Sequence, residues 1–85
     1  MNLAARDRAI LDFERTWWTR SGPKEAAIRT ELGLSGTRYY ELLRRLLDDV
    51  SAYAYDPLTV KRLQRDRDRR RRGRLERSRA DPESR

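Results

Sequence analysis

The sequence predicts a small all-α fold, in which a three-helix domain is followed by a fourth helix that runs into a basic, partly disordered C-terminal tail. Apolar residues recur with the helical period along the first 50 positions, and glycine and proline divide this stretch into segments. Arginine then dominates the last third of the chain. A chain of 85 residues has room for one small domain with a modest core.

A first amphipathic helix is expected over residues 4–20. Ile10, Phe13 and Trp17 recur at spacings of three and four residues, and no glycine or proline interrupts the segment. The tripeptide Ser21-Gly22-Pro23 ends this helix, because proline cannot continue it.

Two adjacent tryptophans close this first helix and cannot share one of its faces. Trp17 lies on the apolar stripe and is expected in the core. Trp18 aligns with Leu11, and for Trp18 we favour core packing over an exposed place at a dimer seam or against the fourth helix. If the protein is a homodimer, the candidate seam residues are Trp18, Leu11, Tyr53 and Tyr55.

Two further helices are expected over residues 23–32 and 35–49. Gly33 ends the earlier one, as a residue that readily takes a positive φ, and Ser35 is a good N-cap for the later one. So short a turn forces the two helices to cross at a large angle. The buried face of the later helix is predicted to comprise Tyr39, Leu42, Leu43, Leu46, Leu47 and Val50.

The segment 51–56 is predicted to be a connecting loop, followed by the fourth helix. Asp56 is a suitable N-cap, and Pro57 suits the first helical position. Val60 and Leu63 are the only strong apolar anchors before arginine takes over. We therefore expect this helix to lose tertiary support and to give way to disorder.

Positive charge is concentrated near the C-terminus. Residues 1–60 carry nine basic and nine acidic side chains, whereas residues 61–85 carry twelve and five, which accounts for the whole net charge of +7. Such an asymmetry is typical of a basic segment that binds a polyanion. We divide the chain into a helical domain, residues 1–56, and a fourth helix with an arginine-rich tail, residues 57–85.

The composition argues against catalysis and against a metal or cofactor site. The chain has no histidine and no cysteine, and Asp48-Asp49 stands at a helix end without a partner constellation. No apolar run approaches the length of a membrane span, and the N-terminus lacks the apolar stretch of a secretory signal. We expect a non-enzymatic cytoplasmic protein that binds no cofactor, no metal and no membrane.

The segment 25–42 resembles the helix-turn-helix of bacterial DNA-binding proteins. The matching positions are Ile28, Leu32, Gly33, Leu34, Tyr39 and Leu42. Arg29 stands where that motif usually has a small residue, so either its side chain extends out of the helix crossing or the register differs by one. The resemblance implies a helix-turn-helix over about residues 23–49.

A wider stretch, from residue 13 to about residue 72, resembles a family of small actinobacterial proteins known only as a domain of unknown function. The likeness rests on Trp17-Trp18, on Ala27 to Arg29 and on Thr37 to Tyr40. It implies that Arg29 belongs to the pattern of this family, and it brings no activity with it.

The helix-turn-helix resemblance implies that the helix beginning at Ser35 reads the major groove of DNA. Arg38 would contact guanine, Tyr40 a phosphate or a thymine methyl, and Ser35 and Thr37 phosphates. The alternative is an ordinary solvated helix face. The candidate DNA-binding residues of this helix are Ser35, Thr37, Arg38, Tyr40, Glu41 and Arg44.

The tail provides a second set of candidate phosphate ligands. They are Arg62, Arg65, Arg69, Arg70, Arg71, Arg72 and Arg74. Arg72-Gly73-Arg74 is similar to the centre of a minor-groove AT-hook, but Leu75 stands where the hook needs proline. The alternative is a solubilising end, and a GC-rich genome would also explain the preference for arginine over lysine.

Together these features predict a protein that binds double-stranded DNA, either a transcriptional regulator or a nucleoid-associated protein of a bacterial cytoplasm. Two alternatives remain open. In the first, the protein is an interaction adaptor that associates with RNA polymerase. In the second, it is an RNA-binding protein whose arginine-rich helix folds onto RNA.

Overall fold

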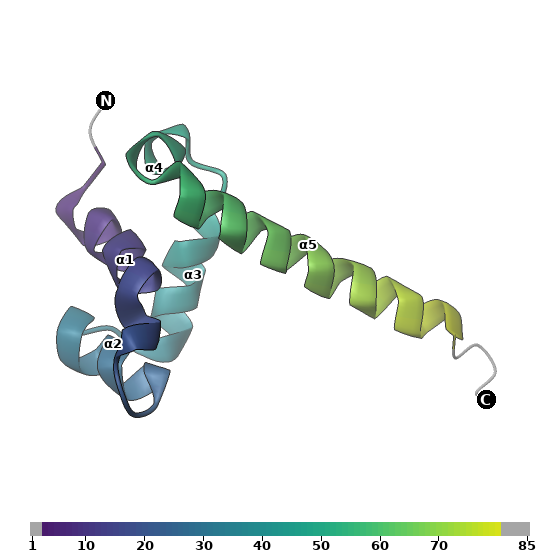
Figure 1. The fold of residues 1–85 in the computed structure, drawn as a ribbon, viewed down its shortest axis with the longest axis horizontal. Coiled ribbons are helices and arrows are strands. Elements are labelled where there is room, and N and C mark those ends of the chain that lie inside the picture. Colours follow the sequence, from purple (N-terminus) through teal and green to yellow (C-terminus); the bar gives the residue numbers. More distant parts are fainter. Residues whose placement is uncertain (1–2, 81–85) are drawn as a thin grey trace.

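A computed structural model describes residues 3–80 of the chain, with side chains placed for residues 3–75. Within these residues every regular element is helical, which confirms the all-α prediction. In chain order the elements are α1 (Ala5–Thr16), the 3₁₀ turn η1 (Trp17–Thr19), α2 (Lys24–Leu32), α3 (Gly36–Leu46), α4 (Val50–Tyr55) and α5 (Pro57–Ala80) (Figure 1).

The core lies where α1 packs against α3. Helix α2 packs on α3, α4 packs on α1 and α5, and the first turns of α5 pack on α1. Figure 1 shows α5 leaving this group of helices and extending well beyond it. The buried apolar residues are Leu3, Ile10, Leu11, Phe13, Ile28, Tyr39, Leu42, Leu43, Leu46, Leu47, Ala52, Val60 and Leu63.

The end of α1 differs from the predicted continuous helix. The α-helix stops at Thr16 and tightens into η1. Trp17 is half-buried against the core, as expected, but the core position predicted for Trp18 is wrong, because this side chain is 64% exposed. Since adjacent residues point in different directions, seating Trp17 leaves the Trp18 indole outside, where its Nε1 donates to the carbonyl oxygen of Arg15 (2.9 Å).

The turn between α2 and α3 follows the predicted chemistry. Gly33 has a φ of +69° and donates its N–H to the carbonyl oxygen of Arg29 (3.0 Å). Ser35 caps α3, because its Oγ accepts from the backbone N–H of Arg38 (3.1 Å). Ile28 is fully buried while Arg29 is exposed, so the arginine points away from the packed side of α2.

The predicted loop over residues 51–56 is wrong, because most of it forms α4. Asp49 begins this helix, and its Oδ1 accepts from the backbone N–H of Ser51 (2.8 Å). Helix α3 therefore ends earlier than expected, and Val50 is 83% exposed instead of contributing to the buried face of α3. A helix of six residues shows fewer than two turns of periodicity, so its pattern is easily mistaken for a loop.

Helix α5 begins as predicted, but it does not give way to disorder within the described residues. Asp56 Oδ1 accepts from the backbone N–H of Thr59 (3.2 Å), and Val60 and Leu63 anchor the first turns in the core. Burial of each anchor contributes about 1.5–3 kcal/mol. The helix then continues to Ala80, and residues 81–85 of the predicted disordered end lie outside the described part.

Replacing Gly33 with alanine should destabilise the fold by about 1–2 kcal/mol, measured by urea unfolding. A Cβ at this position meets no atom within 4 Å, so the cost is that of the left-handed backbone alone. Gly36 in the first turn of α3 is the control, because its φ is not positive and an added Cβ meets only the flexible end of Glu25. Equal losses in G33A and G36A would contradict this interpretation.

Candidate nucleic-acid interface

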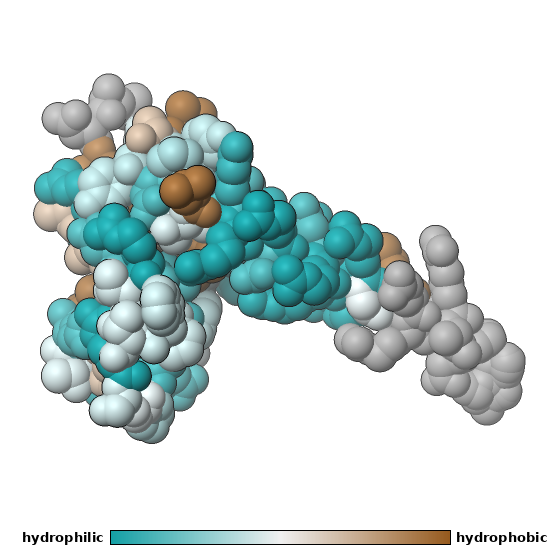
Figure 2. All heavy atoms as spheres, in the orientation of Figure 1, coloured by the Kyte–Doolittle hydropathy of each residue, from teal (hydrophilic) through white to brown (hydrophobic). Residues whose placement is uncertain are grey.

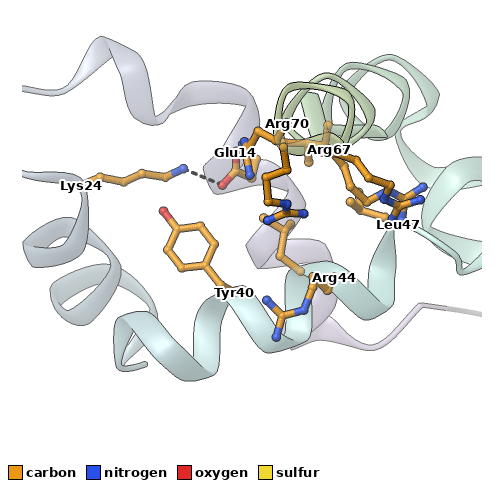
Figure 3. A pocket seen from close by; sticks show the side chains of 11 residues that line it. Glu14, Lys24, Tyr40, Arg44, Leu47, Arg67 and Arg70 are labelled. Atoms are coloured by element: carbon orange, nitrogen blue, oxygen red, sulfur yellow. Dashed lines mark ion pairs between the residues drawn. The ribbon is translucent and has the colours of Figure 1, made fainter. Parts of the chain in front are cut away.

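A groove with a volume of about 450 Å³ lies between α3 and the middle of α5 (Figure 3). Six cationic side chains and one carboxylate line it together with a tyrosine and three leucines. The lining residues are Glu14, Lys24, Tyr40, Leu43, Arg44, Leu47, Leu63, Arg67, Arg70, Arg71 and Arg74. The groove therefore brings together residues from both sets of candidates that the sequence indicated.

Tyr40, Arg44 and Leu47 form the wall that α3 contributes. Their spacing of four and three residues places them on one side of the helix, next to its buried face. Figure 3 shows Tyr40 and Arg44 on α3 across from Arg70 on α5. Of the residues predicted to read DNA, these two border the groove.

The wall from α5 carries Arg67, Arg70, Arg71 and Arg74. They follow Leu63 at helical spacing, so the side of α5 that is buried at its start becomes an arginine row further along. Arg67 was not among the predicted ligands, although its spacing of four residues from Leu63 was the available signal. Its guanidinium pairs with Asp48 (3.4 Å), which ties α5 to the end of α3.

The other predicted tail arginines lie elsewhere. Helical geometry turns Arg65, Arg69 and Arg72 to the side of α5 opposite the groove, where Arg69 pairs with Asp66 (3.2 Å). Arg62 is half-buried and donates to the backbone carbonyl oxygen of Glu14 (3.1 Å), so its guanidinium is engaged within the molecule.

Arg72-Gly73-Arg74 does not form a separate extended hook. Gly73 lies within α5, and the two arginines that flank it project from different sides of that helix. The similarity to an AT-hook therefore has no counterpart in the fold.

The remaining predicted residues of α3 lie on its exposed side. Ser35 serves as the N-cap, Thr37 is exposed, and the Arg38 guanidinium pairs with Glu41 (3.2 Å). Arg45 is exposed on the same side and was missed, because the sequence argument stopped at Arg44. It borders a shallow depression formed with Glu41, Arg44 and Asp48.

Glu14 lies at the base of the groove and is only 2% exposed. Lys24 Nζ lies 2.9 Å from its Oε2, Arg62 Nη2 lies 3.5 Å from its Oε1, and the Tyr39 hydroxyl donates to Oε2. A buried carboxylate is tolerated only with such partners. Because these two cations compensate the Glu14 charge, the arginines give the groove its surplus of positive charge.

The ammonium group of Lys24 also lies close to three aromatic rings around this carboxylate. Its ammonium lies 4.7 Å from the ring centroid of Trp17, 5.5 Å from that of Tyr40 and 5.8 Å from that of Tyr39. These distances allow cation–π attraction. Figure 3 shows the side chain reaching from α2 to Glu14, past the ring of Tyr40.

Burial raises the pKa of the Tyr39 hydroxyl well above its ordinary value of 10, and the adjacent Glu14 carboxylate raises it further. Tyr55 shows a smaller version of the effect at the surface, where its hydroxyl donates to Asp12 Oδ1 (2.8 Å) and this bond raises its pKa. The Tyr39 hydroxyl therefore stays protonated, and able to donate to Glu14, above the pH at which an ordinary tyrosine ionises.

Three of the four proposed seam residues, Trp18, Tyr53 and Tyr55, are exposed. Leu11 is fully buried, so its predicted place at a dimer seam is wrong.

Among residues 3–80 no helix is long and apolar enough to cross a membrane, and in the same part of the chain no acidic side chains gather in a group that could hold a metal ion.

Replacing Tyr39 with phenylalanine should cost about 1–3 kcal/mol of unfolding free energy, because it leaves the buried Glu14 carboxylate short of one donor. The matched control is Tyr55→Phe, which removes an exposed tyrosine–carboxylate bond and should stay within about 0.5 kcal/mol. Urea unfolding of the three proteins checks the difference. Similar losses in both variants would show that burial of Glu14 does not strengthen its bond.

Stability should decline in alkaline solution through Tyr39. Its pKa is raised in the folded state, so its contribution is complete below the unfolded value of 10 and is lost as the pH rises above it. Each pH unit above about 10 should remove about 1.4 kcal/mol. Tyr39→Phe should flatten this decline, and an equally steep decline in that variant would assign it to other groups.

The comparisons with known proteins give one match. A family described as a protein of unknown function (DUF3263) matches residues 2–79. No curated protein and no solved structure matches the chain. The match spans nearly the whole sequence and confirms the expected membership of a family of unknown function, so the chain belongs to the DUF3263 family.

Proposed function

We propose that this protein binds double-stranded DNA, with α2, the Gly33 turn and α3 acting as a helix-turn-helix. In this proposal α3 enters the major groove and α5 lies along the phosphates. The observation that carries the proposal is the convergence of α3 and the arginine row of α5 on one groove. A transcriptional regulator and a nucleoid-associated protein both fit this mode of binding.

The exposed side of α3 has the side chains that base and phosphate contacts require. Its packed face is fixed by Tyr39, Leu42 and Leu46, so Arg38 and Arg45 are turned outward. Arg38 is held by Glu41 near the start of the helix, where side chains of a recognition helix meet base edges. Exchange of this surface ion pair for a guanine would cost little, because such pairs contribute about 0–1 kcal/mol.

The charge of α5 fits a polyanionic partner. Figure 2 shows a hydrophilic surface along most of this helix, in contrast to the mixed surface over the other helices. Arg70, Arg71 and Arg74 are exposed and form no ion pair with any side chain among residues 3–75. Cations in this state are available to phosphates, and each contact releases counterions from DNA.

A protein-interaction adaptor is the second candidate function. Val50 is 83% exposed and Leu58 is 79% exposed, on α4 and at the start of α5. Apolar side chains so exposed fit a protein partner better than DNA. We propose RNA polymerase as this partner. Replacing Val50 and Leu58 together with serine should then weaken binding of the protein to RNA polymerase without changing its affinity for DNA.

Replacing Arg38 with alanine should weaken binding to a selected DNA site by about 1–3 kcal/mol and relax the choice at one base position. Arg44→Ala should weaken binding to all duplexes more evenly, as loss of a phosphate contact does. Arg6→Ala is the control, because it removes an exposed arginine from the start of α1. Selection from a random duplex library followed by fluorescence anisotropy measures these effects.

Thermal melts of the same variants separate binding from folding, since exposed substitutions change stability by about 0.5 kcal/mol or less. If R38A and R44A melt normally and bind DNA like the parent, α3 is not the reading helix. Duplex RNA provides the second comparison, because its deep and narrow major groove does not admit an α-helix. Equal affinity for RNA and DNA duplexes would favour the RNA-binding alternative.

A further inference from the structure

The groove between α3 and α5 is lined from two sides, which distinguishes it from a uniformly charged helix. Arg44 projects into it from α3, and Arg70, Arg71 and Arg74 project from α5. None of these four guanidinium groups pairs with a carboxylate among residues 3–75. We infer that this groove seats one sugar–phosphate strand of the nucleic acid, an inference that rests on the proposed DNA binding.

The spacing of the arginine row fits consecutive phosphates. Arg67 and Arg74 are seven residues apart, so the row extends over about 10 Å of helix axis at 1.5 Å per residue. One strand of a duplex carries a phosphate about every 3.4 Å along the axis. Because the strand winds around that axis, its consecutive phosphates lie about 6–7 Å apart along the backbone, so a strand that runs beside α5 presents about two phosphates to this row.

The apolar part of the lining favours a strand over a small hydrated anion. Leu43, Leu47 and Leu63 line the groove beneath the arginines, and the ring of Tyr40 borders it. An isolated phosphate would lose hydration against such a surface, whereas the carbons of a sugar can pack on it. The volume of about 450 Å³ falls within the range of about 300–1,000 Å³ of sites that take organic ligands.

Helix α5 itself supplies a matched pair of variants. The groove variant replaces Arg70, Arg71 and Arg74 with glutamine, and the control replaces Arg65, Arg69 and Arg72, on the opposite side. Both remove three positive charges from the same stretch of helix. For a duplex of fixed sequence, the groove variant should reduce the slope of log affinity against log salt by about two, and the control by less than about one.

A second measurement locates the nucleic acid without relying on affinity. The chain has no cysteine, so Arg71→Cys and Arg72→Cys each provide a single thiol, on adjacent residues and on different sides of α5. Saturating duplex should slow alkylation of the thiol in R71C by more than about tenfold and leave the thiol in R72C nearly unaffected. Melting curves of all variants establish that they fold.

The outcomes separate this inference from the function on which it rests. If the parent binds no duplex at any salt concentration, both fail. A second outcome is that the parent binds duplex, the two triple variants lose affinity equally and both thiols are protected alike. The arginines then act as diffuse charge, and only the inference that the groove binds one strand is overturned. Stronger protection of R71C by an acidic peptide than by duplex would assign the groove to a protein partner instead.

Discussion

The carboxylate of Glu14 on α1 receives a polar group from α2, from α3 and from α5. Lys24, Tyr39 and Arg62 all end at this buried group: the two cations compensate its charge, and the tyrosine hydroxyl donates a hydrogen bond to it. Apolar packing alone would tolerate small rotations of the helices. A buried carboxylate with directional partners restricts such rotations, because its two ion pairs and its hydrogen bond hold α2, α3 and α5 to α1.

The parts of the fold that could be predicted from sequence are those set by local chemistry. Gly33 ends α2 because glycine readily takes a positive φ, and Ser35 and Asp56 start helices because their side chains accept backbone N–H groups. Val60 and Leu63 were recognisable as anchors because almost nothing apolar follows them. In the candidate site, Tyr40 and Arg44 were predicted from the resemblance to a helix-turn-helix, and the arginine run from the concentration of positive charge in residues 61–85.

The remaining features depend on tertiary packing, which periodicity does not report. Glu14 reads as a surface residue of an amphipathic helix, and only the approach of α2, α3 and α5 shows why it is buried. Trp17 and Trp18 are equally apolar, so the sequence does not show which of them is buried. In the fold the Trp17 indole packs against the core and the Trp18 indole is exposed. The division of the arginines between two sides of α5 could not be predicted either. A run of consecutive arginines places a cation on every side of a helix, so the sequence does not show which of them face the groove until the packed side of the helix is known.

Helix α5 passes from a packed segment to an arginine row without any break in its backbone. The number of residues between Leu63 and Arg70 consequently sets the direction in which the arginine row points, because each residue added to a helix rotates the residues beyond it by about 100° around the helix axis. One inserted uncharged residue would carry the row out of the groove while leaving the net charge unchanged. In this chain the length of the segment between Leu63 and Arg70 therefore determines which side chains face the groove as much as the identity of those side chains does.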